Sequence, residues 1–461
     1  MWPNDSTYQG TAQNADFYFN SPIAPLSSEE DEYNRSWVYL SERVKQNWAN
    51  YLYELNKQHQ LELPKPNALT SYDNPDYLWL SYELNELRNA YNAAMRDPQT
   101  GDVLPGCGQL PYIQLHLKAN AFSKENLHPK STLNTYGAAY RPHYVVEFEQ
   151  PFLKAFMCFL FEIFDDNPQE FKVINGRKQI VHQYKAPIYR LPPFDKYFDT
   201  RHDLPGLMFS RAVQMLLAHE IAHVGGGHLD LQAKDPEYGY SVDTMIAEED
   251  DADAQAICWI LGIRFLEVQG RQLEISYEDF RQELALSVFA VYILFTWIYS
   301  KDERVWSNRT IEEHGKKGHL PYQLRAYNML CVSCTRMTKL GEWSERDQIV
   351  TLDNKMITVD FMESAFDEAM QMIEAFERAY HMFFAKTEDV YNLALDGKFD
   401  ELRQMIFNES NEELPQLKKE NIPWMLGFEP ESQEELKRVK TLWNKVRKRL
   451  AENGSYCRLR E

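Results

Sequence analysis

The stretch that decides the fold runs from Met208 to His223 and reads MFSRAVQMLLAHEIAH. It is rich in apolar residues and contains neither proline nor glycine, which favours a long helix. Three glycines at 225–227 predict the end of this helix, because glycine adopts left-handed backbone conformations without strain. After a loop of about fifteen residues, Ser241 or Asp243 can cap a second helix. We therefore expect two neighbouring antiparallel helices at the centre of the molecule.

The end of the first helix carries two histidines and an acid in a pattern that suits a metal ion. His219 and His223 are four residues apart, so a helix places them on one face. The intervening Glu220 can sit beside the open coordination position of a metal held by both rings. This is the H-E-x-x-H pattern of zinc peptidases, in which zinc lowers the pKa of its bound water to about 7 and the carboxylate takes a proton. The alternative is that both histidines cap or pack the helix.

A catalytic zinc ion needs a third protein ligand, and the sequence offers two candidates. His228 follows His223 by five residues, one short of the spacing in three-histidine zinc peptidases, so we expect it to be a bystander. The start of the second helix is the better source. We expect Glu249 to bind the metal and Asp253, on the same face, to accept the free N–H of a ligand histidine, most simply His219.

The alternative interpretation of this acidic segment is a solvated first turn that stabilises the helix dipole. It accounts for Glu248, Asp250 and Asp251. It does not account for Asp253, which lies in an apolar stripe where an unpaired carboxylate would be unfavourable.

These two elements together, H-E-x-x-H and the run E-x-x-A-D from Glu249 to Asp253, resemble the gluzincin metallopeptidases. Within them, the chain is similar to the group that contains the CAAX prenyl protease and the heat-shock protease HtpX. The run His219 to His228 is also similar to the Lit-type phage-exclusion peptidases, which are cytoplasmic and cleave a host protein. The resemblance implies a minimal zincin-like core, Zn2+ as cofactor, and hydrolysis of a protein or peptide substrate. By analogy, it implies one specific intracellular target in a phage-defence or toxin-like role.

The resemblance extends to a third element, HLPYQLR, which runs from His319 to Arg325. In the prenyl-protease group, a histidine and an arginine with this spacing both serve the active site. The resemblance therefore implies that His319 donates a hydrogen bond to the oxyanion and that Arg325 orients Glu249 or the oxyanion. The alternative is a loop histidine and a surface arginine. The family's multiple membrane spans are absent, and the resemblance covers about residues 205–330.

The composition of the 461 residues, with 44% hydrophobic residues and a net charge of −20, predicts a globular protein and argues against a nucleic-acid partner. The few scattered cysteines and the absence of a signal peptide predict a cytoplasmic location. Residues 284–300 carry no charge and are expected to form a buried core helix; a membrane helix is the alternative. Membrane association is therefore not expected, whereas a regulatory partner protein is compatible with the sequence.

We predict a mainly α protein, α+β in its catalytic core, with a small β-hairpin or sheet and additional helical segments at both ends. Residues 97–142, rich in Pro, Gly and polar residues, are expected to be connecting structure. The expected regions are an irregular arm (1–34), a helical region with a hairpin near 171–181 (35–200), the zinc peptidase core (201–340) and a helical region ending in a basic helix (341–461). The alternatives to a cytoplasmic zinc peptidase are a non-catalytic, metal-binding regulatory protein and a membrane-associated peptidase.

Overall fold

The structure is a computed structural model, and helices dominate its described part, so the protein is mainly α as predicted. The predicted arm (1–34) and His319 lie outside the described residues. The structure describes residues 75–94, 113–118, 130–134, 143–149, 169–174, 177–183, 204–269, 275–301, 322–347, 351–384 and 430–452, and positions 100, 102, 110, 153, 156, 160 and 164.

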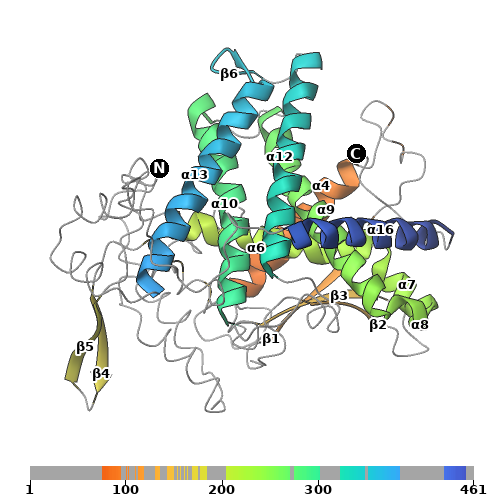
Figure 1. Ribbon diagram of the computed structural model, residues 1–461, viewed down its shortest axis with the longest axis horizontal. Coiled ribbons are helices and arrows are strands. Elements are labelled where there is room, and N and C mark those ends of the chain that lie inside the picture. The colour runs from red at the N-terminus through yellow and green to blue at the C-terminus, as the bar shows by residue number, and fades with distance from the viewer. Residues whose placement is uncertain are drawn as a thin grey trace.

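Helix α6, Leu204–Gly225, is the central element (Figure 1). Nearly all of its residues are buried, because its sequence is apolar on all sides and such a helix belongs in a core. It is packed against helices α4 (Pro75–Ala94), α9 (Val242–Gln269) and α10 (Tyr277–Lys301). The helix ends where the three glycines predict, and Gly227 adopts a left-handed conformation with φ of 76°.

The segment between α6 and α9 contains two further helices, α7 (His228–Lys234) and α8 (Pro236–Gly239), so the expected loop was wrong. The glycines interrupt the backbone for a single turn only, and the chain then buries Leu229 and Leu231 from α7. Ser241 precedes α9, and its Oγ accepts a hydrogen bond from the backbone N–H of Thr244 at 3.4 Å. One of the two predicted caps is therefore in place.

Helix α9 is antiparallel to α6, as pairs of contacts along both helices show. Gln214, in the middle of α6, accepts a hydrogen bond from Arg264 near the end of α9, at 3.0 Å. His223, at the end of α6, lies 3.4 Å from Glu249 near the start of α9. Helices α12 (Tyr322–Asp347) and α13 (Val359–Phe384) complete this bundle, with α12 packed against α9 and α13 against α10 and α12.

Helix α10 contains the uncharged segment 284–300. By length and composition, Tyr277–Ile298 is long and apolar enough to cross a membrane, but 83% of its apolar window is buried inside the protein. It packs against α6, α12 and α13, and Phe289 and Trp297 are fully buried. The segment is thus a core helix here, as expected.

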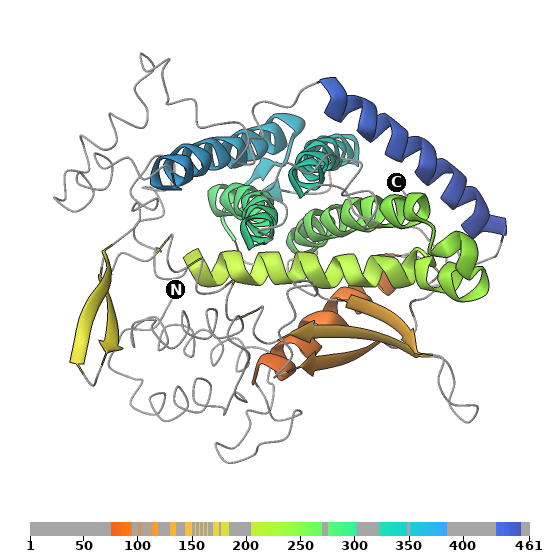
Figure 2. The ribbon, with the colours of Figure 1, turned by 60° about the horizontal axis from the view of Figure 1, so that its bottom comes forward.

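A three-stranded sheet lies on the opposite side of α6 from α10, α12 and α13 (Figure 2). Its order is β1 (Ile113–Lys118), β3 (His143–Glu149) and β2 (Lys130–Asn134), with β1 parallel and β2 antiparallel to β3. Two of these strands fall within 97–142, so the interpretation of that region as connecting structure was wrong. Strand β1 alternates apolar and polar residues, and this period over six residues went unrecognised.

The predicted hairpin near 171–181 is confirmed by strands β4 (Gln169–Ile174) and β5 (Arg177–Gln183). They pair antiparallel, and Ile174 opposes Arg177, so two residues join the strands. A second small hairpin, β6 (Thr351–Leu352) and β7 (Lys355–Met356), joins α12 to α13.

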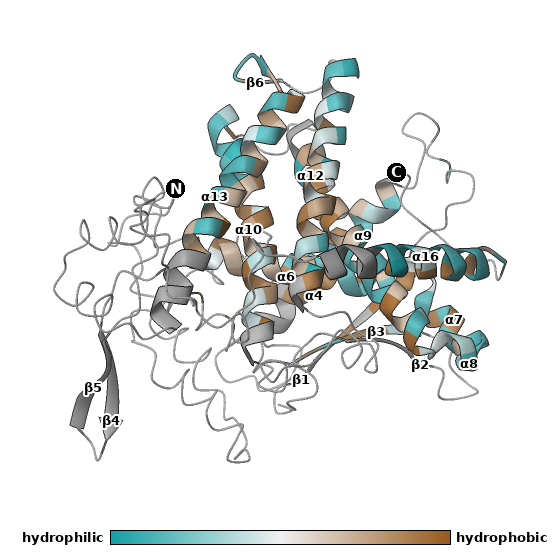
Figure 3. Ribbon diagram, in the orientation of Figure 1, coloured by the Kyte–Doolittle hydropathy of each residue, from teal (hydrophilic) through white to brown (hydrophobic). Residues whose placement is uncertain are grey.

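The basic C-terminal helix is present as α16, Pro430–Glu452, and it lies along α9. Its apolar stripe, including Val439, Trp443 and Leu450, is buried against the body of the protein. Its outer face is strongly hydrophilic, in contrast to the apolar interior of the bundle (Figure 3). The predicted basic helix is therefore an integral part of the fold.

Candidate metal centre

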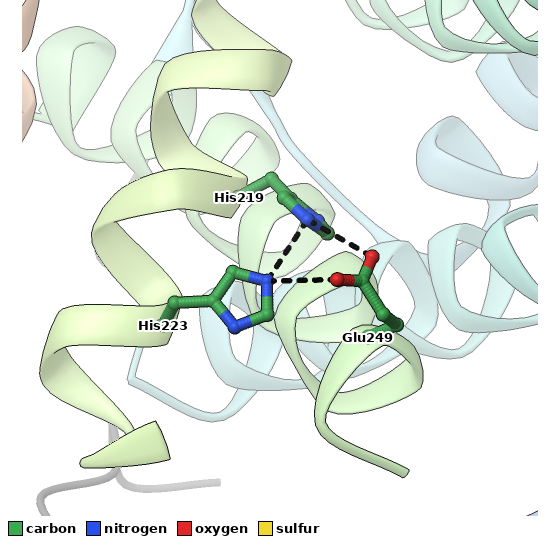
Figure 4. A group of neighbouring side chains, drawn as sticks. All are labelled: His219, His223 and Glu249. Carbon is green, nitrogen blue, oxygen red and sulfur yellow. Dashed lines mark hydrogen bonds and ion pairs between the residues drawn. The ribbon is translucent and has the colours of Figure 1, made fainter. Parts of the chain in front are cut away.

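Three side chains from two helices converge on one point (Figure 4). Both histidines project from α6 and Glu249 projects from the antiparallel α9. The Nε2 atoms of His219 and His223 are 3.1 Å apart. Nε2 of His219 lies 3.4 Å from Oε2 of Glu249, and Nε2 of His223 lies 3.4 Å from its Oε1. The spacing of four residues and the antiparallel packing of α9 together produce this triangle.

The three side chains are close enough to bind one metal ion, because one ligand atom from each lies within 4.8 Å of the other two. Ligand atoms bound to one tetrahedral zinc ion at about 2.0–2.1 Å are themselves about 3.3 Å apart. Within the described part of the chain, this is the one group of three or more His, Cys, Asp or Glu side chains able to hold a metal ion. The residues present therefore fit a bound metal, and the choice of zinc belongs to the proposal below.

His219 is held by a carboxylate on the side away from the triangle, because its Nδ1 lies 2.9 Å from Oδ1 of Asp253. Burial alone would lower the pKa of His219, but its hydrogen bonds with Asp253 and Glu249 and their negative charges raise it to about 10. The two carboxylates thus stabilise positive charge at the triangle, whether a proton or a metal ion supplies it. Asp253 occupies the supporting position that the sequence predicts for it.

Arg325, from the first turns of α12, bridges the two carboxylates. Its Nε and Nη2 lie 2.7 and 2.9 Å from the oxygens of Asp253, which is a two-bond, charge-assisted contact. Its Nη2 also lies 3.4 Å from Oε2 of Glu249. Burial raises the pKa of Asp253, but the charge of Arg325 and hydrogen bonds from His219 and Arg325 lower it overall. Arg325 is buried, so it is not a surface arginine, and its contacts suit an orienting role.

Glu220 lies between the two histidines on α6 and is buried, with 4% of its surface exposed. The Glu249 side chain is more open, at 19% exposure. The position of Glu220 next to His219 is the one that the H-E-x-x-H pattern specifies.

His228 is not part of the triangle, but it contacts one of its members. Its Nδ1 lies 3.0 Å from Nδ1 of His223, the ring nitrogen on the side away from Glu249. It is fully buried, and burial lowers its pKa. His228 is therefore outside the ligand group, as expected, but the sequence did not predict its contact with His223. The turn at the glycines brings His228 back against the end of α6.

The acidic first turns of α9 are not a solvated face, contrary to the alternative interpretation. Glu248 and Asp251 are buried, and Asp250 is partly buried. Each has a partner: Gln232 donates to Glu248 at 2.9 Å, Asn328 donates to Asp250 at 2.7 Å, and Gln255 donates to Asp251. Burial is the main cause that raises the pKa of Glu248 to about 8 and that of Asp250 to about 7.

The structure thus brings together five predicted site residues, His219, His223, Glu249, Asp253 and Arg325, with Glu220 on the same helix as the two histidines. No protein-family model, no curated protein and no solved structure matches this chain. The function is therefore inferred from the geometry and chemistry of the site.

Proposed function

We propose that this protein is a zinc-dependent peptidase whose metal is held by His219, His223 and Glu249. The observation that carries the proposal is the convergence of two Nε2 atoms, 3.1 Å apart, on the carboxylate of Glu249, whose two oxygens each lie 3.4 Å from one of them. An H-E-x-x-H helix and an antiparallel acidic helix bring these groups together. The choice of peptide bonds as the substrate rests on the H-E-x-x-H pattern.

The donor set supports zinc and a catalytic site over a structural one. Two imidazoles and one carboxylate are a ligand set of catalytic zinc, whereas structural zinc is closed by four protein ligands, usually with cysteine among them. Zinc bound here would lower the pKa of a water molecule to about 7 and polarise the carbonyl of a peptide bond. Cys258, Cys331 and Cys334, the described cysteines, are not members of the ligand group.

The chain's own residues would supply proton transfer and positioning. Glu220 would accept a proton from the attacking water and deliver it to the nitrogen of the leaving amine. Asp253 would keep Nδ1 of His219 protonated, so that its Nε2 presents a lone pair. Arg325 would act as a positioning residue that holds the carboxylates of Asp253 and Glu249 in one orientation. Donation of a hydrogen bond by His319 to the oxyanion remains a proposal based on the family resemblance.

The proposal includes the wider expectations from the sequence. The substrate would be a protein or peptide, and the site of action would be the cytoplasm, with neither nucleic acid nor a membrane as partner. We further propose that the protein cleaves a single intracellular target, as the Lit-type peptidases do. An experiment on whole cells tests this directly.

The test compares cells that express the parent protein with cells that express Glu220→Gln. The parent should generate new protein N-termini that Glu220→Gln does not, while both purified proteins contain the same amount of metal. Glu342→Gln is the matched control, since Glu342 is an exposed residue of α12, and it should cleave like the parent. Equal cleavage by Glu220→Gln and the parent would contradict the mechanism. Metal without cleavage in both would favour the metal-binding regulatory alternative.

A further inference from the structure

We infer that His228 is a positioning residue for the ligand His223, and that the C-terminal helix α16 completes this support by enclosing His228 with Trp443. The inference rests on the metal site of the proposed function and adds two elements that the H-E-x-x-H pattern does not contain. It also gives the basic terminal helix a role in the site, although α16 contributes none of the three proposed ligands.

The hydrogen-bond roles follow from the geometry of the two rings. If Nε2 of His223 is a metal ligand, the neutral ring carries its proton on Nδ1. That proton can be donated to Nδ1 of His228, 3.0 Å away. His228 then carries its own proton on Nε2, which faces Oδ2 of Asp251 at 3.5 Å. Both ligand histidines are thus held through the nitrogen that does not face the triangle, one by a carboxylate and one by an imidazole.

The surroundings of His228 fix its ring. The edge of His228 meets Trp443 of α16, with ring centroids 5.8 Å apart at 80°. A Cβ at Gly226 would come within 2.7 Å of Nε2 of His228, so only glycine leaves room for the ring. Water is excluded, because His228 is fully buried. A buried ring confined in this way has few orientations available and holds its Nδ1 toward His223.

Helix α16 is attached firmly enough to serve as this cover. Trp443 packs in one buried cluster with Leu231 of α7 and Ala247 of α9. Val439, four residues before Trp443, packs in a second buried cluster with Ile246 of α9 and Leu324 of α12. The helix therefore contacts both the element that carries His228 and the element that carries Glu249.

Three substitutions of His228 separate a hydrogen-bonding role from a packing role. His228→Asn places an amide atom the same number of bonds from Cα as Nδ1, whereas His228→Gln places it at the distance of Nε2. His228→Leu fills more of the space than asparagine but has no polar atom. A packing role therefore ranks leucine above asparagine, and a positioning role ranks asparagine above both leucine and glutamine.

The experiment measures the zinc affinity of the purified full-length proteins by competition with a chelator, and the absorption spectrum after replacement of zinc by Co2+. We expect roughly 10–100-fold weaker binding and an altered Co2+ spectrum for His228→Leu and His228→Gln, and near-parent values for His228→Asn. Trp443→Ala should weaken binding because water then reaches His228, while Lys445→Ala, an exposed residue of the same helix, should have no effect.

If His228→Leu does not fold, the comparison of His228→Asn with His228→Gln decides the question in the same way. Parent-like zinc affinity in both the leucine and the glutamine variant would overturn the inference while leaving the proposed function intact. Failure of the parent itself to bind a metal would overturn the proposed function, and the two failures are therefore distinguishable.

Discussion

Replacing Asp253 with asparagine tests whether the two carboxylates and Arg325 act as one support for the metal site. The change keeps the shape of the side chain but removes its charge and one acceptor oxygen. In the structure, the carboxylate contacts Nδ1 of His219 at 2.9 Å and accepts hydrogen bonds from Arg325 at 2.7 and 2.9 Å. The amide of asparagine has only one oxygen, so its NH2 group must face an N–H donor of either His219 or Arg325. Water cannot relieve this mismatch, because Asp253 is only 2% exposed.

The expected magnitude follows from these contacts. Removal of one partner of a buried ion pair lowers the free energy of unfolding by about 3–5 kcal/mol. In Asp253→Asn, Arg325 still has Glu249 as a partner at 3.4 Å. We therefore expect the loss in free energy of unfolding to lie at the lower end of this range, about 3 kcal/mol. The loss of a defined tautomer at His219 should also weaken zinc binding by roughly 10–100-fold. Urea denaturation of the metal-free protein and chelator competition measure the two effects separately.

Asp243→Asn is the matched control, because it makes the same chemical change on the same helix. Its partner Arg438 lies 3.0 Å away in an exposed ion pair, so the free energy of unfolding should change by less than about 1 kcal/mol. Zinc affinity should not change. If Asp253→Asn matched the parent in both stability and zinc affinity, the reasoning from the network would be refuted.

Two further substitutions test the elements that frame the site. Gly226→Ala should destabilise the protein by about 1–3 kcal/mol, because the new Cβ would meet Nε2 of His228 at 2.7 Å and a backbone oxygen at 2.9 Å. The control Gly262→Ala meets only the flexible end of a side chain at 3.1 Å and adds a better helix former, so thermal or urea denaturation should show no comparable loss. Tyr144→Phe removes the hydrogen bond from the tyrosine hydroxyl to Asp230 at 2.8 Å, which fastens α7 to the sheet. It should lower the urea midpoint by an amount equal to about 1–3 kcal/mol, and an unchanged midpoint would show that this contact does not stabilise α7.

The parts of the fold and site that could be predicted are those encoded by local spacing. A four-residue interval on a helix is enough to place His219 beside His223 and Glu249 beside Asp253. The short connection between α6 and α9 then favours antiparallel packing of these two helices, which brings the four residues together. The same reasoning applies to the end of α6, where three glycines mark the turn, and to the hairpin around Asn175–Gly176.

The parts that could not be predicted depend on contacts between distant segments or on weak local signals. Strands β1 and β2 are short and lie among prolines and glycines, so their period of two is masked by turn residues. Helix α7 directly follows the three glycines, after which a loop was expected. The contact of His228 with Trp443 joins segments far apart in the sequence, and no local pattern encodes it.

The central claim, that His219, His223 and Glu249 hold a metal ion, is tested most directly by the metal-to-protein ratio of the purified full-length chain. Elemental analysis of the parent should give about one zinc ion per chain. The double variant His219→Ala/His223→Ala should contain none, and its metal-free form should have the same far-UV circular dichroism spectrum as the metal-free parent. A parent without stoichiometric metal, or a double variant that retains it, would contradict the account.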